Sequence, residues 1–351
     1  MAKNPNPQRF VSALVLVALA HAVEFPRQTA GHYQVTLRLP AEGLYAQEES
    51  QIEFRIEDLG RPDPLTGFTP VVRATPRAVI DMPSMRGMPQ FTETAHAEPA
   101  PGDYGIHPTF AHGGDYRLRI TIEPNLTAEF PLAVNDAPAK RKALPPRYTL
   151  ELTANPKKPK PNEPVELRLL VRDQDNNNAP VTAFETVHEK LLHLVIVRRD
   201  LELFAHEHPT PNPDGSFTLR HTFSSAGEYR LFADTAPRGA GGQILSAKMT
   251  VPGKVVEIAP ATIAGPGEYP ARKTIPITFP SPATPLEPWL GAIGHLLLIH
   301  EDAQTFVHSH PDDSGTLTFL TRFPKPGEYR AWLQYQTGGK IHTETFRLHA
   351  K

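Results

Sequence analysis

The sequence contains no cysteine among its 351 residues. That absence excludes disulfide frameworks, thiolate metal sites, cysteine nucleophiles and iron–sulfur clusters. An excess of basic residues is also missing, since 36 Lys and Arg stand against 38 Asp and Glu, for a formal net charge of −2. We therefore expect no nucleic-acid partner, because phosphate binding needs clustered positive charge.

Long apolar runs are absent beyond the N-terminus, where residues 1–22 have the pattern of a signal peptide. Lys3 and Arg9 precede an apolar segment that is too short to span a bilayer, and small residues follow it at the usual cleavage spacing. Cleavage leaves Val23 as the first residue, or His21 in a competing frame, whose amine and imidazole together can chelate copper. We expect an exported protein, periplasmic or extracellular, with no transmembrane segment in the mature chain.

Proline is abundant instead, with 39 residues beside 23 glycines. Short segments with alternating polar and apolar or β-branched side chains lie between turn clusters, as in residues 33–39, 51–56, 148–152 and 165–169. This period of two is typical of half-buried strands. The sequence therefore predicts an all-β protein.

Two segments, at residues 193–230 and 295–330, repeat one pattern. Each starts with a histidine and four aliphatic residues, continues with F-x-H-x-H-P, and ends with a phenylalanine followed by G-E-Y-R. A fainter upstream copy keeps only the second half of the pattern, at Gly102, Phe110, Gly114 and Tyr116. Repetition at this length indicates tandem copies of one structural unit.

Units of about 100 residues built from short strands favour immunoglobulin-like β-sandwiches. We predict three related sandwiches in tandem, the second and third of them rich in histidine. A Pro-rich, basic linker separates the first from the second. The expected ranges are 23–137 for the first sandwich, 138–146 for the linker, 147–252 for the second sandwich and 254–351 for the third.

The repeated histidines are candidate metal ligands. In each H-x-H pair both side chains project from the same face of a strand. A hairpin turn at Arg199 and Asp200 is expected to bring the preceding strand alongside and to place His193 opposite His206. Neutral imidazole is a good ligand for Cu(II) and for Zn(II). The predicted ligand sets are His193, His206 and His208 in one copy and His295, His308 and His310 in the other.

The first unit carries a different candidate site, a loop with Met82, Met85 and Met88 separated by proline, serine, arginine and glycine. Thioether sulfur is a soft ligand suited to Cu(I). His96 is a candidate to complete this set. A loop whose methionines only fill irregular space over the sandwich is the alternative. Methionine and histidine motifs in one chain favour copper over zinc, which has little use for thioether.

These motifs resemble known domains. The methionine loop followed by Gly102, Phe110, Gly114 and Tyr116 resembles the YtkA-like/FixH-like domain. That resemblance implies an immunoglobulin-like module in an exported or membrane-associated protein, of a group often linked to copper handling. The histidine units at 193–209 and 295–311 are similar to tandem modules of uncharacterised secreted bacterial proteins.

The residues and the resemblance together predict a non-enzymatic, exported protein that buffers, sequesters or transfers copper in the cell envelope, with an envelope protein as a candidate partner. A metal-free structural rod of tandem sandwiches is one alternative. A copper or zinc enzyme is another, because three histidines with an open position resemble catalytic zinc sites. No Ser–His–Asp order, phosphate loop or H-E-x-x-H motif supports an enzyme.

Overall fold

The computed structural model describes residues 25–351 apart from 66, 86, 137–145, 259–262 and 312–313. In this part of the chain every regular element is a strand, which confirms the predicted all-β class. No helix among these residues is long and apolar enough to cross a membrane. The predicted signal peptide, both candidate mature N-termini and all but one residue of the predicted linker lie outside the described residues.

The first domain is a sandwich of two sheets, with strand orders β1-β2-β4-β9-β8 (β5 pairs with β4) and β3-β11-β10-β6-β7. Alternate residues such as Val35, Phe54 and Phe130 fill the space between the sheets. The strands are β1 (Arg27–Ala30), β2 (Tyr33–Arg38), β3 (Leu44–Tyr45), β4 (Ile52–Asp58), β5 (Thr69–Pro70), β6 (Arg77–Asp81), β7 (Phe91–Thr94), β8 (His96–Ala97), β9 (Asp103–Ile106), β10 (Gly114–Glu123) and β11 (Leu126–Asn135).

The second domain has sheets of order β12-β13-β19-β18 (β14 pairs with β13) and β15-β20-β16-β17 (β21 pairs with β20). Leu167, Leu194 and Phe217 lie in its core. The strands are β12 (Tyr148–Asn155), β13 (Pro164–Asp173), β14 (Ala179–Pro180), β15 (Phe184–Glu185), β16 (Leu192–Arg198), β17 (Phe204–Glu207), β18 (Thr210–Pro211), β19 (Ser216–Thr222), β20 (Gly227–Pro237) and β21 (Gln243–Val251).

The third domain pairs a sheet of order β22-β28-β27-β24-β25 with a small sheet of β23 and β26. Phe319, Leu333 and Leu348 lie in its core. The strands are β22 (Ile263–Tyr269), β23 (Thr274–Thr278), β24 (His295–His300), β25 (Phe306–Ser309), β26 (Thr318–Arg322), β27 (Gly327–Thr337) and β28 (Lys340–Ala350).

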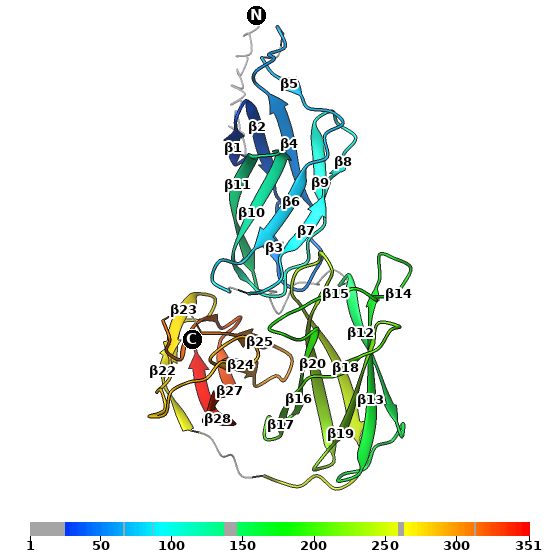
Figure 1. The fold of residues 1–351 in the computed structure, drawn as a ribbon, viewed down its shortest axis with the longest axis vertical. Coiled ribbons are helices and arrows are strands. Elements are labelled where there is room, and N and C mark those ends of the chain that lie inside the picture. Colours follow the sequence, from blue (N-terminus) through cyan, green and yellow to red (C-terminus); the bar gives the residue numbers. More distant parts are fainter. Residues whose placement is uncertain (1–24, 66, 86, 137–145, 259–262, 312–313) are drawn as a thin grey trace, which may run out of the picture.

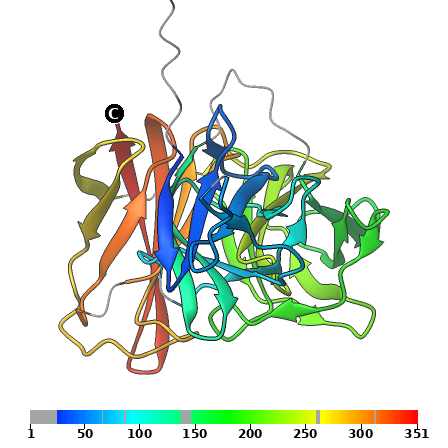
Figure 2. The same ribbon diagram turned by 90° about the horizontal axis from the view of Figure 1, so that it is seen from above.

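The second and third domains lie side by side, and the first domain sits over the junction between them (Figures 1 and 2). Their interface has its own apolar cluster, in which Phe204 stacks on Trp332 with ring centroids 4.6 Å apart, and Phe232 stacks on Phe306 at 5.0 Å. Aromatic pairs of this kind stabilise an interface beyond the area they bury. The histidine units therefore belong to domains that are packed against each other.

This interface explains why β16 is apolar at nearly every position. Leu194 and Ile196 point into the second domain's core, whereas Val195 and Val197 point into the cluster shared with the third domain. A strand that is buried on both faces loses the polar positions of a half-buried one. Because side chains alternate along a strand, His193 projects from the same face as Val195, toward the neighbouring domain.

Candidate metal centre

The register of the β16–β17 hairpin differs from the sequence prediction. Val195, not His193, is paired with His206, so the expected pairing was wrong by two residues. The turn is longer than expected: the backbone N–H of Arg198 donates to the carbonyl of Leu203 across it. His193 is therefore a diagonal neighbour of His206, still on the same face of the sheet, and the convergence of the three rings survives the correction.

The first triad consists of His193, His206 and His208, whose nearest ring nitrogens all lie within 4.8 Å of one another. Nδ1 of His193 lies 3.2 Å from Nε2 of His206 and 3.1 Å from Nε2 of His208. Two nitrogens bound to one tetrahedral metal ion stand about 3.3 Å apart. The spacing is therefore that of a metal-ligand set.

Hydrogen bonds on the outer nitrogens fix the tautomers of two of these rings. Nε2–H of His193 donates to the carbonyl of Val187 at 2.9 Å, and Nδ1–H of His206 donates to Oε1 of Gln334 at 2.8 Å. The inner nitrogens of both rings then carry lone pairs that face each other. Two lone pairs cannot share a hydrogen bond, but both can bind one cation, and the outer bonds orient the rings as the supporting residues of metal sites do.

The second triad, His295, His308 and His310, repeats this arrangement. Nδ1 of His295 lies 3.4 Å from Nε2 of His308 and 3.0 Å from Nε2 of His310. Nε2–H of His295 donates to the carbonyl of Trp289 at 3.0 Å, and Nδ1–H of His308 donates to Oδ2 of Asp234 at 2.8 Å. Here too, two lone pairs face each other with no proton between them.

The two triads face each other across the interface between the second and third domains. The ring of His308 lies 5.5 Å from that of His193 and 5.7 Å from that of His206, centroid to centroid. Each domain also supplies the residue that orients a ligand of the other, Gln334 for His206 and Asp234 for His308. The two sites therefore depend on the packing of both domains.

Sequence reasoning missed these two orienting residues, although a signal for them exists. Asp234 follows Arg230 by the same distance as Gln334 follows Arg330, so the two occupy equivalent positions of the repeat. Asp234 is paired across the sheet with His193, and Gln334 with His295. A polar residue directly after three apolar ones, at the same place in both copies, could have identified them.

Burial keeps the ligand rings neutral at pH 7. It lowers the pKa of His206 to about 4 and that of His208 to about 3. It also lowers the pKa values of His295 and His308 well below the usual value for histidine. Because metal ions bind the neutral imidazole, protons compete little with a metal at these positions.

Asp234 is a buried acidic residue at the interface between the second and third domains. The residue is 1% exposed, and in the described part of the chain its ion-pair partner is His308, which is neutral at pH 7. Its Oδ1 atom has no hydrogen-bond partner there. Burial raises the pKa of Asp234. A buried carboxyl among neutral imidazoles lacks positive charge, which a bound cation would supply.

The carboxyl of Asp234 orients His308, whereas the neutral amide of Gln334 orients His206, and this difference predicts two sites of unequal affinity. We expect the site containing His308 to bind metal more tightly, because a carboxylate increases the basicity of a ligand more than the neutral Gln334 amide does. Replacing Asp234 with Asn is expected to weaken that site by about 10–100-fold. The reciprocal variant, Gln334→Glu, should strengthen the site containing His206. Competition titration with a copper chelator measures both affinities, and identical curves for Asp234→Asn and the parent protein would contradict this assignment.

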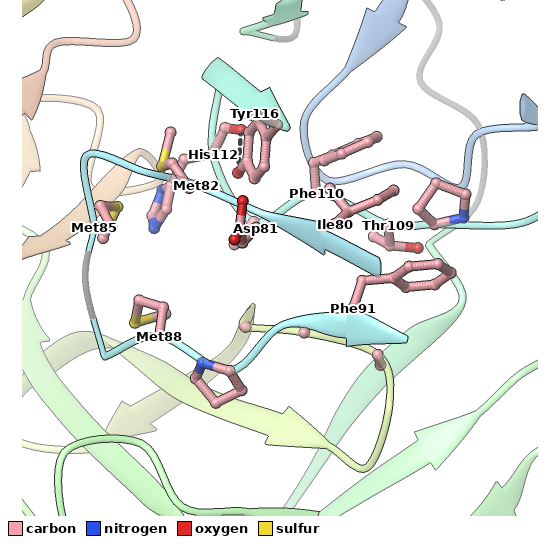
Figure 3. Close-up of a pocket in the computed structure, with 16 residues that line it drawn as sticks. Ile80, Asp81, Met82, Met85, Met88, Phe91, Thr109, Phe110, His112 and Tyr116 are labelled. Carbon is pink, nitrogen blue, oxygen red and sulfur yellow. Dashed lines mark hydrogen bonds between the residues drawn. The ribbon is translucent and has the colours of Figure 1, made fainter. Parts of the chain in front are cut away.

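The methionine loop lies where all three domains meet. Met82, Met85 and Met88 line one cavity of about 50 Å³ together with His112, whose ring lies beside Met82 and Met85 (Figure 3). His96 is not among the residues that line it. The structure thus brings the three predicted methionines together and places His112, which the sequence did not single out, where His96 was expected.

His96 lies instead in a cluster with Glu93 and His107 on the first domain, where three ligand atoms lie within 4.8 Å of one another. The rings of His96 and His107 stack with centroids 4.9 Å apart. His96 is exposed, and its Nε2 forms a 3.0 Å hydrogen bond with Glu98. Nε2 of His96 is thus engaged by a carboxylate outside this cluster.

His188 has no equivalent in the other copy of the repeat, yet its ring lies against the second triad. Its ring stacks on that of His310 at 3.5 Å, and its Nε2 is buried without a hydrogen-bond partner in the described residues. A side chain at Gly87 would lie 3.2 Å from its ring. His188 therefore stands between the methionine loop and the second triad.

Among solved structures, the chain is similar to the Escherichia coli adhesin FdeC (13% identity, 94% of this chain and 100% of that chain, TM-score 0.23). It is also similar to a Salmonella α-2-macroglobulin (12% identity, 93% and 24% coverage, TM-score 0.24). A third similarity is to invasin, a bacterial integrin-binding protein (14% identity, 90% and 60% coverage, TM-score 0.22). No curated protein matches the sequence.

Two families match the sequence in consecutive segments. The YtkA-like family matches residues 28–121, which confirms the resemblance drawn from the methionine loop. A family described as a domain of unknown function, DUF8832, matches residues 145–257 and 261–351, the two segments that carry the histidine triads. Because this second match covers more than half of the sequence, the chain belongs to the DUF8832 family, with a YtkA-like domain preceding the family's segments.

Proposed function

We propose that this protein is an exported, non-enzymatic copper-binding protein that buffers, sequesters or transfers the metal in the cell envelope. The observation that carries the proposal is the pair of opposed lone pairs in each triad, between His193 and His206 and between His295 and His308. These lone pairs support metal binding, because one cation can bind both ring nitrogens of a pair at once.

Copper is proposed over zinc because imidazole and thioether ligands occur together. Zinc binds imidazole well but makes little use of thioether, whereas copper uses imidazole as Cu(II) and thioether as Cu(I). Met82 and Met85 line cavities between the first domain and the other two, and His188, which stacks on His310, lies next to Gly87 of the same loop. The YtkA-like match and the N-terminal sequence pattern support export and a role in the envelope.

Storage or transfer is proposed over catalysis because three of the six ligand rings are almost completely buried. His193, His295 and His308 are at most 1% exposed, which leaves little access for a substrate larger than an ion. Asp234, the carboxyl that contacts the second triad, is engaged in orienting His308 through one oxygen. Copper- or zinc-dependent turnover of a small substrate such as dioxygen would favour the enzyme alternative.

A Cu(II) titration of the purified protein tests the proposal. Both tryptophans of the chain lie at the interface, and the ring of Trp289 is 5.0 Å from that of His295, so binding should quench intrinsic fluorescence. We expect saturation near two equivalents and an affinity far above that of an unstructured histidine peptide, with a rise in melting temperature. Binding no tighter than the peptide, together with a metal-independent melting temperature, would refute the proposal and favour a purely structural rod.

A further inference from the structure

The nitrogen of His112 that faces away from the backbone is left without a partner. His112 is 9% exposed, and its Nε2 atom has no hydrogen-bond partner in the described part of the chain. A buried polar atom without a partner costs about 1–3 kcal/mol. Two of the polar groups that line the same cavity are already engaged: Asp81 pairs with Arg117 and Arg119, and the hydroxyl of Tyr116 donates to the carbonyl of His112.

The side chains that surround this ring are thioethers. Met82, Met85 and Met88 line the same cavity, and Figure 3 shows the ring of His112 beside Met82 and Met85, with Met88 farther along the loop. Methionine sulfur does not satisfy an imidazole nitrogen well, because it is only a weak hydrogen-bond acceptor. A soft cation can bind the sulfurs and the nitrogen together.

We propose that His112 and the three methionines form a site for one soft, monovalent metal ion, distinct from the two histidine triads. The ion is Cu(I) if the proposed function is right, and the inference rests on that function only for this choice of metal. His112 supplies the nitrogen ligand and the methionines supply sulfur. A cavity of about 50 Å³ has room for one ion.

The second domain forms one wall of the site, with Ala240, Gly241 and Gly242. The backbone N–H of Thr92, just after the methionine loop, donates to the carbonyl of Gly239 at 2.7 Å, and Phe91 forms a β-bridge with Ala240. A Cβ atom on Gly242 would lie 2.6 Å from the methyl carbon of Met88, so glycine at this position leaves room for the methionine. Docking of the two domains therefore completes the lining of the cavity.

Residue-resolved NMR tests this site with Ag(I), a soft monovalent ion that has no accessible redox chemistry here. In protein labelled at the methionine methyl groups, we expect the signals of Met82, Met85 and Met88 to shift and to saturate together at one equivalent. Met249, on β21, is the internal control and should not move. Methyl signals that do not respond to Ag(I) would overturn the proposal.

Variants then separate the role of His112 from that of its neighbours. His112→Leu fills a similar volume without a nitrogen and should lower the Ag(I) affinity of the methionine signals at least tenfold. His96→Ala, at an exposed histidine of the same domain, should leave the affinity unchanged. If His112→Leu unfolds, Met85→Leu tests the same set with a smaller change and should also lose at least tenfold in affinity.

If folded His112→Leu binds Ag(I) with the affinity of the parent protein, His112 is not the nitrogen ligand. If His96→Ala loses Ag(I) affinity, His96 is the nitrogen ligand instead. These outcomes are independent of the histidine triads, because thioether methyl signals report only on the methionines. A protein that binds Ag(I) at the methionines but no Cu(II) at the triads would keep this inference and refute the proposed function. A protein that binds Cu(II) at the triads but no Ag(I) at the methionines would refute this inference and keep the proposed function.

Discussion

Replacing His206 and His308 together with alanine is expected to abolish high-affinity Cu(II) binding, with a stoichiometry that falls from two to zero. Each substitution removes one of the two opposed lone pairs of a triad and leaves Gln334 or Asp234 without the ring it orients. Losing only an orienting hydrogen bond costs about 10–100-fold in metal affinity, so losing the ligand itself should cost more than that at each site.

Equilibrium dialysis with copper analysis measures this loss directly. The matched control is His221→Ala with His342→Ala, which also removes one histidine from each of the two domains. His221 interacts with Glu207 and His342 with Thr337, and neither belongs to a triad. We expect the control to keep two tightly bound ions. Copper retained by the first double variant, or lost by the control, would contradict the assignment of the ligands.

The metal-free protein is expected to lose stability as the pH falls below about 6.5. Burial lowers the pKa values of His188 and His206 to about 4 and that of His208 to about 3. Histidines in the unfolded chain have pKa values of about 6.5, so below that pH the unfolded state binds protons that the folded state does not. This loss continues down to the folded-state pKa values of about 3 to 4 and then stops.

The size of this effect is at most about 2 kcal/mol per histidine between pH 7 and pH 5. Asp234 and Glu49 act in the opposite direction, because their pKa values are raised, but the buried histidines outnumber them. Urea unfolding at both pH values, after treatment with a chelator, measures the difference. The His206→Ala, His308→Ala variant should show a smaller dependence on pH. Equal stability of the parent protein at pH 7 and pH 5 would be inconsistent with neutral, buried rings.

The sequence predicted the fold class and both triads because their signals are local. An H-x-H pair fixes two side chains on one face of a strand, and the repeat showed that His193 and His295 accompany these pairs. The hairpin register could not be predicted, since it depends on how Leu203 and Arg198 close the turn. A shift of two residues left the rings on the same face, so the predicted site survived this error.

The contacts between domains carry no such local signal. His112 lies in the fainter upstream copy of the repeat, but the other two copies have Ser225 and Lys325 at the equivalent position, so the repeat does not mark it as a ligand. Its approach to the methionines depends on how the first domain folds and packs on the other two. His188 likewise reaches the centre only through its contact with His310 of the neighbouring domain. His96 is close to the methionines in sequence, but β8 carries it into the opposite sheet of the first domain from the one that contains β6 and β7.

The most direct test of the central claim is a crystal structure of the copper-loaded protein with anomalous scattering measured at the copper absorption edge. We expect one anomalous peak bound by Nδ1 of His193 and Nε2 of His206 and His208. A second peak should be bound by the corresponding atoms of His295, His308 and His310. Copper found only at other positions, with the rings of both triads unmoved and unoccupied, would contradict the account.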